Sequence, residues 1–115
     1  MISVREPKSI IELRTVALIP AYNEGGKIRE VIQATQEYVD HIVVCDDGST
    51  DDTLMTLDSL DVDIVRHEDN CGYGAALVSL FKYCQSFDAD YAVTIDADGQ
   101  HAHAHSINEV NKHIH

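Results

Sequence analysis

The chain has 115 residues, of which 20 are acidic and 8 basic, and its formal net charge is −12. Such a charge disfavours proteins that bind nucleic acid or an anionic membrane through basic patches. Its hydrophobic content of 44% suffices for one modest core, and no apolar run approaches the roughly 18–20 residues of a membrane span. We therefore expect a soluble chain with a polar lead-in, residues 1–14, followed by one domain, residues 15–115.

The first predicted unit is a strand followed by a helix. Residues 15–20 (TVALIP) form a short apolar run closed by proline, which is typical of a buried strand. In residues 25–39, apolar side chains recur at spacings of three and four, the period of one helical face. This segment is predicted to be an amphipathic helix.

Two further units repeat the pattern. Residues 41–47 (HIVVCDD) predict a second strand, and residues 49–60 predict a helix with Ser49 or Thr50 at its N-cap. Residues 63–69 (DIVRHED) predict a weaker third strand. The segment after Gly74 predicts the next helix, with an apolar face of Leu77, Leu80, Phe81, Cys84 and Phe87.

The fourth unit begins with residues 91–98 (YAVTIDAD), a predicted strand, and Ile107, Val110 and Ile114 suggest a last helix. Parallel neighbours need crossover connections, so strands alternating with helices predict a parallel sheet flanked by helices. The expected fold class is α/β, a Rossmann-like nucleotide-binding half with a mainly parallel sheet of about four strands.

Three loops that follow predicted strands are rich in polar residues. They are residues 20–24 (PAYNE), 46–51 (DDGSTD) and 96–101 (DADGQH). In open α/β sheets, ligands bind beyond the carboxyl ends of the strands. We expect these loops to line one rim of the sheet and to form the site.

Asp96 and Asp98 are candidate metal ligands. Two carboxylates one residue apart at the end of a strand can reach one divalent ion, which then bridges the phosphates of a nucleoside diphosphate. An isolated Asp-x-Asp is weak evidence, because turns often contain Asp and Gly for backbone reasons. The position after an apolar strand favours the metal.

The acidic pair Asp46 and Asp47 has two interpretations. Their carboxylates could accept hydrogen bonds from a nucleotide base or ribose, or they could belong to a turn that leads into the next helix. Asp51 and Asp52 fall in the first turn of that helix and are expected to serve its dipole instead of a ligand.

Residues 70–76 (NCGYGAA) hold a GxG but not the GxGxxG of a dinucleotide site. They predict a tight turn into a helix, whose small residues could leave room for a nucleotide above it.

The histidines and cysteines point to no metal framework. His101, His103 and His105 alternate near the end of the chain, where a solvated tail is the preferred interpretation over a transition-metal site. The three cysteines form no CxxC pair and are expected to be reduced, cytosolic thiols. Cys45 and Cys84 fall in apolar patterns that predict burial.

Taken together, the motifs IPAYNE, DDGSTDDT, NxGxGAA and DADGQH resemble family 2 glycosyltransferases of GT-A fold, and most of all their dolichyl-phosphate mannosyltransferase-like branch. The resemblance covers roughly residues 15–101. It implies a nucleoside-diphosphate sugar donor (GDP-mannose or a UDP-sugar), a divalent Mg²⁺ or Mn²⁺, and transfer to an acceptor such as a polyprenyl phosphate. In that branch the reaction takes place at the cytoplasmic membrane face.

The resemblance also assigns roles to individual residues. Asp47 would hold the base, and Asp96, Asp98 and Gln100 would hold the metal. Pro20, Ala21, Tyr22, Glu24, Asp46 and Ala97, together with Asp98, would border the nucleotide sugar. No catalytic base is assigned.

Other functions remain open. Relatives continue into an acceptor half, and this chain is expected to stop before it, so it could be an inactive fragment, or a nucleotide-binding module that needs a partner chain or self-associates. A nucleotidyltransferase would need a Gly-rich, basic loop where PAYNE stands. A response-regulator receiver would need a fifth strand followed by lysine, and the sequence predicts only four strands.

Overall fold

The computed structural model describes residues 14–86, 89–99 and, for the backbone alone, 102–106. A single sheet with strand order β3-β2-β1-β4-β5 forms its centre. The strands are β1 (Thr15–Ala21), β2 (His41–Asp47), β3 (Asp63–His67), β4 (Tyr91–Ile95) and β5 (Ala102–Ser106). The helices are α1 (Ile28–Thr35), α2 (Thr53–Asp58) and α3 (Tyr73–Cys84).

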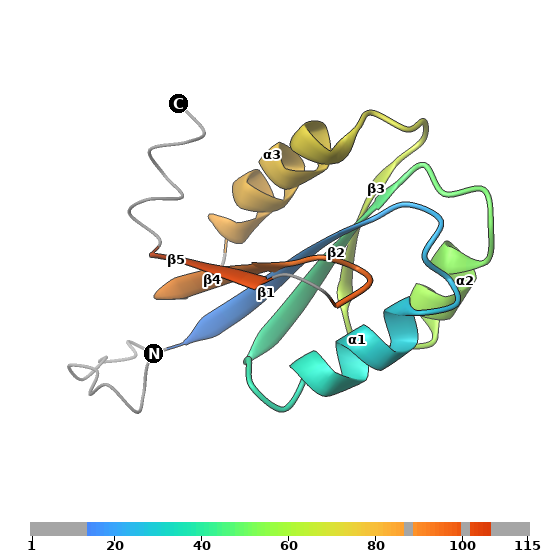
Figure 1. Ribbon diagram of the computed structural model, residues 1–115. Coiled ribbons are helices and arrows are strands. Elements are labelled where there is room, and N and C mark those ends of the chain that lie inside the picture. Colours follow the sequence, from blue (N-terminus) through green and yellow to red (C-terminus); the bar gives the residue numbers. More distant parts are fainter. Residues whose placement is uncertain (1–13, 87–88, 100–101, 107–115) are drawn as a thin grey trace, which may run out of the picture.

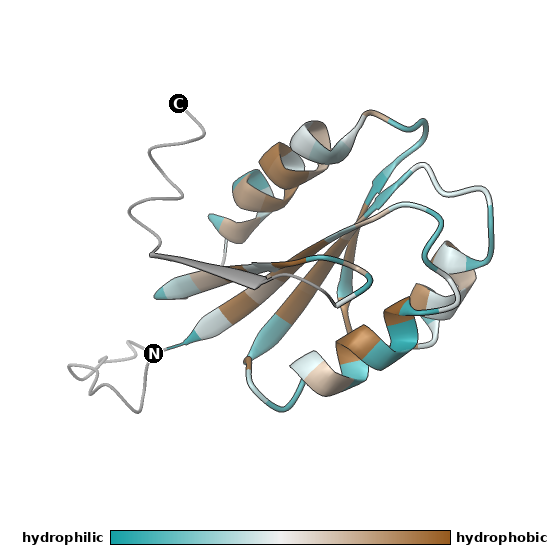
Figure 2. Cartoon of the chain, in the orientation of Figure 1, coloured by the Kyte–Doolittle hydropathy of each residue, from teal (hydrophilic) through white to brown (hydrophobic). Residues whose placement is uncertain are grey.

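Helices cover both faces of this sheet (Figure 1). On one face, α3 packs its apolar side against alternate residues of β1 and β2, and the buried set comprises Val16, Leu18, Val43, Cys45, Ala76, Leu80, Cys84 and Ala92. On the other face, α1 and α2 cover the remaining residues of the same strands. The central strands are therefore apolar on both faces (Figure 2). The predicted parallel four-strand α/β sheet is confirmed, since β3, β2, β1 and β4 all run parallel.

The helices are shorter than their sequence patterns suggest. The predicted helix over residues 25–39 is helical only in α1, although its periodic face is buried as expected at Ile28, Ile32 and Thr35. The expected N-cap of α2 is wrong, because the N-cap is Asp52. The hydroxyl of Ser49 instead accepts a hydrogen bond from the backbone N–H of Asn23 at 2.9 Å.

A fifth strand corrects the expectation of four. β5 pairs antiparallel with β4, with Thr94 opposite His103 and Ala92 opposite His105, so the expected solvated tail is wrong for this segment. Alternation of histidine with alanine has the period of a strand, and a free edge of β4 supplies the partner. The helix expected around Ile107, the lead-in up to residue 13 and Phe87 all lie outside the described residues.

The strand order places a crevice between β1 and β4. β1 joins β2 on one side and β4 on the other, and this reversal of order is where open α/β sheets bind ligands. The β1–β4 pairing ends at Leu18 opposite Thr94, whereas β1 stays paired with β2 up to Ala21. Pro20 lacks a backbone N–H to donate and lies beyond the last β1–β4 pair. The sheet therefore opens at the rim that carries the polar loops.

Candidate functional site

Two adjoining hollows lie at this rim and share Pro20, Tyr22 and Tyr73. One, of about 290 Å³, is also lined by Ala21, Asp47, Asn70, Gly72 and Ala76. The other, of about 310 Å³, is also lined by Glu24, Asp96, Ala97 and Asp98. The structure thus brings together eight of the residues chosen from sequence. Of the other two, Asp46 does not line either hollow and Gln100 lies outside the described residues.

Tyr73 links the two hollows and was not selected from the sequence. It is the first residue of α3, and its hydroxyl lies 3.5 Å from Oδ1 of Asp96, to which it donates a hydrogen bond. Partial burial, the negative charge of Asp96 and this hydrogen bond raise the pKa of Tyr73. The tyrosine therefore stays a neutral donor beside the carboxylate. Sequence reasoning considered this loop only for its small residues, which give no sign of where the ring would point.

Asp47 is the centre of a hydrogen-bond network that ties β2 to the start of α3. Its Oδ1 accepts from the backbone N–H of Cys71 at 2.8 Å, and its Oδ2 accepts from the backbone N–H of Gly72 at 2.9 Å. Asn70 donates its side-chain amide to Oδ2 at 3.2 Å, and Nδ1 of His67 lies 2.8 Å from Oδ1. Both carboxylate oxygens are thus already engaged within the protein.

The charge state of Asp47 follows from these contacts. Burial alone would raise its pKa, but hydrogen bonds from Cys71, His67 and Gly72 outweigh burial and leave the pKa below its ordinary value. Hydrogen bonds to the ionised form favour that form. Asp47 therefore remains a carboxylate although it is only 3% exposed.

Asp46 is equally buried but points to the opposite face, as alternation along a strand requires. It is 1% exposed, and its Oδ1 accepts from the backbone N–H of Ser49 at 3.1 Å. Its Oδ2 has no hydrogen-bond partner within the described part of the chain. The two neighbouring aspartates thus differ in their partners and not in their burial.

Asn23 joins the first two loops of the rim, which the sequence did not reveal. Its Oδ1 accepts from the backbone N–H of Thr50 at 2.8 Å, and its own backbone adopts a left-handed φ of 53°. Beside it, the N–H of Glu24 donates to the hydroxyl of Thr53 at 3.0 Å. Asp51 and Asp52 do not fall in the first turn of α2 as expected, because Asp52 is its N-cap and Asp51 precedes it, where it accepts from the N–H of Thr53 at 2.9 Å. These contacts fix the loop that carries Tyr22.

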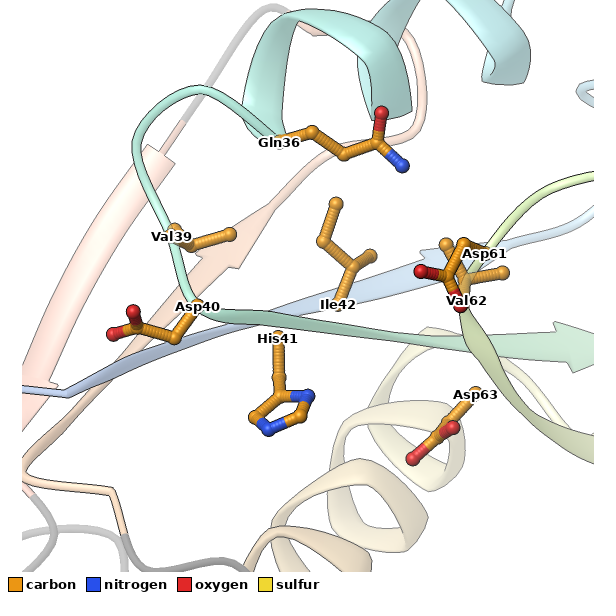
Figure 3. Close-up of a pocket in the computed structure, with 8 residues that line it drawn as sticks. All are labelled: Gln36, Val39, Asp40, His41, Ile42, Asp61, Val62 and Asp63. Atoms are coloured by element: carbon orange, nitrogen blue, oxygen red, sulfur yellow. The ribbon is translucent and has the colours of Figure 1, made fainter.

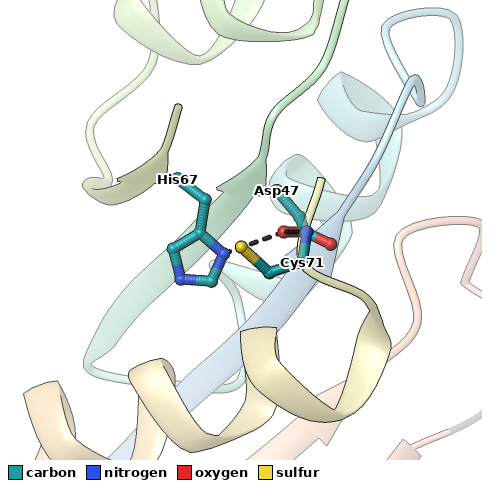
Figure 4. Close-up of side chains that lie close together, drawn as sticks. All are labelled: Asp47, His67 and Cys71. Atoms are coloured by element: carbon teal, nitrogen blue, oxygen red, sulfur yellow. Dashed lines mark hydrogen bonds and ion pairs between the residues drawn. The ribbon is translucent and has the colours of Figure 1, made fainter. Parts of the chain in front are cut away.

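Three side chains of types that can bind a metal lie close together (Figure 4), and we call them the Asp47–His67–Cys71 cluster. Its Asp47 also lines the first hollow. One potential ligand atom from each residue lies within 4.8 Å of the others. Nε2 of His67 lies 2.8 Å from the hydroxyl of Ser79 on α3. No spacing rule in the sequence predicts this cluster, because its members come from β2, β3 and the loop before α3.

A larger hollow, of about 560 Å³, lies at the opposite rim, where β2 and β3 begin (Figure 3). Its lining includes three carboxylates, those of Asp40, Asp61 and Asp63. Two of them serve the fold: Asp40 accepts from the backbone N–H of Thr15 at 2.9 Å, and Asp63 accepts from the hydroxyl of Tyr83 at 3.1 Å. We assign no ligand to this hollow, because the ligand-binding end of such a sheet is the other rim.

The reactivity of the three cysteines gives a first test of their burial in the structure. Cys71 is exposed, whereas Cys45 and Cys84 are buried, as their apolar patterns predict. Burial, followed by the charges of Asp47 and Asp46, raises the pKa of Cys45 to about 12, so it is not a thiolate at neutral pH. Iodoacetamide is expected to modify Cys71 alone in the native protein and all three cysteines after unfolding, as read by mass spectrometry. Equal labelling of Cys45 and Cys71 in the folded state would contradict the structure.

Comparison with known proteins gives one consistent result. A model of the family "Glycosyl transferase family 2" matches residues 16–114. The chain is 37% identical to UDP-N-acetylglucosamine–dolichyl-phosphate N-acetylglucosaminyltransferase of Methanococcus voltae, with 74% of this chain and 41% of the relative covered. It is 32% identical to polyprenol monophosphomannose synthase of Mycolicibacterium smegmatis, with 77% of this chain and 37% of the relative covered.

Solved structures show the same fold. Glucosyl-3-phosphoglycerate synthase from Mycobacterium tuberculosis, crystallised with Mn²⁺, UDP and glucosyl-3-phosphoglycerate, superposes with a TM-score of 0.61 at 26% identity over 84% of this chain and 40% of that one. TarS of S. aureus superposes with a TM-score of 0.64 at 23% identity over 75% and 28%. The chain thus spans about two fifths of the length of the curated relatives named above. None of the described helices has the length and apolar character needed to cross a membrane.

Proposed function

Because the chain belongs to glycosyl transferase family 2, we propose that it binds a nucleoside-diphosphate sugar in the two hollows at the carboxyl end of its sheet. The observation that carries this proposal is the convergence of Asp96 and Asp98 with Tyr22 and Tyr73 around one hollow, which adjoins a second hollow of similar size. A carboxylate pair beside such a crevice suits a diphosphate held through a divalent ion. The names of relatives that act on or bind UDP-sugars and UDP support the same ligand class.

The chemistry of the second hollow fits a hard divalent cation. Asp96 and Asp98 follow β4 directly and are half-buried, and Asp96 is oriented by the hydroxyl of Tyr73. Oxygen ligands of this kind suit Mg²⁺ or Mn²⁺, and we propose that Gln100 completes the set. A cation bound there would offset the charge that develops on the departing diphosphate.

The remaining residues would hold the nucleotide. We propose that Pro20, Ala21, Tyr22 and Glu24 border it from the β1 side and Ala97 from the β4 side, since all five line the hollows. Asp47 would approach the base from the first hollow, held in its ionised form by its backbone donors. Asp46 does not line either hollow. It would contribute indirectly, by accepting the hydrogen bond from the N–H of Ser49 in the loop after β2.

For the full reaction, we propose transfer of the sugar to a polyprenyl phosphate acceptor at the cytoplasmic face of a membrane. The dolichyl-phosphate and polyprenol named for two relatives support this acceptor class. We assign no catalytic base among the described residues. The alternative is a nucleotide-binding module that transfers no sugar alone or requires a partner chain; the chain covers 41% and 37% of those two relatives.

Calorimetric titration with GDP and UDP, with and without Mn²⁺, tests the donor site. We expect binding that depends on Mn²⁺ and weakens at least about tenfold in Asp96→Ala, Asp98→Ala, because loss of even an outer-shell metal partner typically costs 10–100-fold. The matched control is Asp58→Ala, Asp61→Ala, which removes the same charge from exposed positions that line neither hollow of the proposed donor site. A folded chain that binds neither nucleotide would contradict the proposed function. Turnover with a polyprenyl phosphate would then separate the transferase from the binding module.

A further inference from the structure

We propose that the Asp47–His67–Cys71 cluster is a second metal site, selective for a thiophilic transition metal such as Zn²⁺ and distinct from the Asp96–Asp98 pair. The cluster offers one sulfur, one nitrogen and one oxygen ligand. Such mixed ligands favour Zn²⁺ or Co²⁺ over Mg²⁺, whereas the two carboxylates of Asp96 and Asp98 offer only oxygen and favour Mg²⁺. The site does not depend on the proposed role in nucleotide binding.

The distances suit a tetrahedral ion after small shifts of the ligand atoms. A tetrahedral Zn²⁺ with bonds of roughly 2.0–2.3 Å separates its ligand atoms by roughly 3.3–3.8 Å. The three ligand atoms already lie within 4.8 Å of one another. Nδ1 of His67 and Oδ1 of Asp47, now 2.8 Å apart, would need to move apart by less than about one ångström. The ion would lie between these two atoms, and the ring would carry its proton on Nε2.

The surroundings provide support for the histidine. Nε2 of His67 faces the hydroxyl of Ser79 at 2.8 Å, so the ring can donate from Nε2 while Nδ1 binds the metal. Histidine ligands in metal sites commonly donate their second ring nitrogen in this way, which fixes the tautomer and the ring orientation. Asp47 is held in place by the backbone N–H groups of Cys71 and Gly72.

Cys71 lies on the exposed side of the cluster, so a metal ion can reach the site from solvent. Cys71 is exposed, and its Sγ now donates to the carbonyl of Asp69 at 3.3 Å, a weak bond that coordination would replace. On binding, the thiol would release its proton to solvent and the ion would keep one position for water. The occupied site would join β2, β3 and the loop before α3, three segments that are separate in the sequence.

Titration of the full chain with Co²⁺ tests the site. A thiolate bound to Co²⁺ gives a sulfur-to-metal charge-transfer absorption in the near ultraviolet, which carboxylates and histidines do not produce. We expect this absorption in the wild-type chain and in the Asp96→Ala, Asp98→Ala variant, and its loss in Cys71→Ser. The affinity should fall at least about tenfold in His67→Gln. Zn²⁺ should displace Co²⁺ and raise the melting temperature of the wild type but not of Cys71→Ser.

Two controls separate this site from other ligands. Cys45→Ala removes the buried thiol that lies 3.9 Å from the ring nitrogens of His67, and it should leave the absorption unchanged. The His101→Gln, His103→Gln, His105→Gln variant should also retain it. Cobalt binding without the thiolate absorption, or an unchanged absorption in folded Cys71→Ser, would overturn the proposal. The three side chains would then only stabilise the fold through their hydrogen bonds.

Discussion

Replacing Gly48 by alanine is expected to destabilise the protein by about 2–5 kcal/mol, as measured by urea unfolding. Gly48 has a φ of +75°, a left-handed conformation that costs an alanine about 1–2 kcal/mol. A Cβ there would also lie 2.5 Å from the backbone nitrogen of Asn70 and the carbonyl carbon of Asp69. Those backbone atoms belong to the loop whose N–H groups bind Asp47, so relief of the clash would disturb that network.

Gly99→Ala is the matched control for the clash. Gly99 has nearly the same φ, +78°, but among the described residues a Cβ there would meet only a methyl group of Val31, at an ordinary 3.5 Å. Gly99→Ala should therefore lower the free energy of unfolding only by the cost of the left-handed backbone, about 1–2 kcal/mol. Equal destabilisation by the two substitutions would show that close packing of the Gly48 loop contributes nothing.

Asp47→Asn is expected to lower the free energy of unfolding at neutral pH by about 2–4 kcal/mol, because an amide nitrogen would face a buried N–H donor in place of a carboxylate oxygen. Charge-assisted hydrogen bonds from the backbone of Cys71 and Gly72 would be lost or weakened. Asp46→Asn is the matched control on the next residue of the same strand. It should cost less, because one oxygen of Asp46 already has no partner within the described structure.

The acid dependence of stability should change with Asp47→Asn as well. The pKa of Asp47 is lowered in the folded state, so its contribution is fully present above the unfolded value of about 4 and is lost as pH falls through the lower folded pKa. The wild type should therefore lose more stability than Asp47→Asn between neutral pH and about pH 3. Parallel urea unfolding curves at the two pH values measure this difference. Identical losses would show that Asp47 does not stabilise the fold through its charge.

Local patterns in the sequence were enough to predict the four parallel strands and the rim, but not β5. β1 and β2 are apolar runs buried on both faces, and such runs are visible without a structure. Because parallel strands end at one edge, PAYNE, DDGSTD and residues 96–99 (DADG) had to meet there. The limits of α1 and the cap of α2 were less predictable, because they depend on hydrogen bonds between loops, such as that from the N–H of Asn23 to Ser49.

What the sequence by itself determined was the α/β order, the apolar strands and the chemical types at the rim, because each rests on periodicity or on position after a strand. Tertiary structure alone decided which of the two aspartates has hydrogen-bond partners for both carboxylate oxygens. It also placed the hydroxyl of Tyr73 beside Asp96, and His67 and Cys71 beside Asp47. It also decided that β5 adds to the sheet, since a strand needs a partner edge. These outcomes depend on strand order and on which face a side chain takes, which bring together residues that are far apart in the sequence.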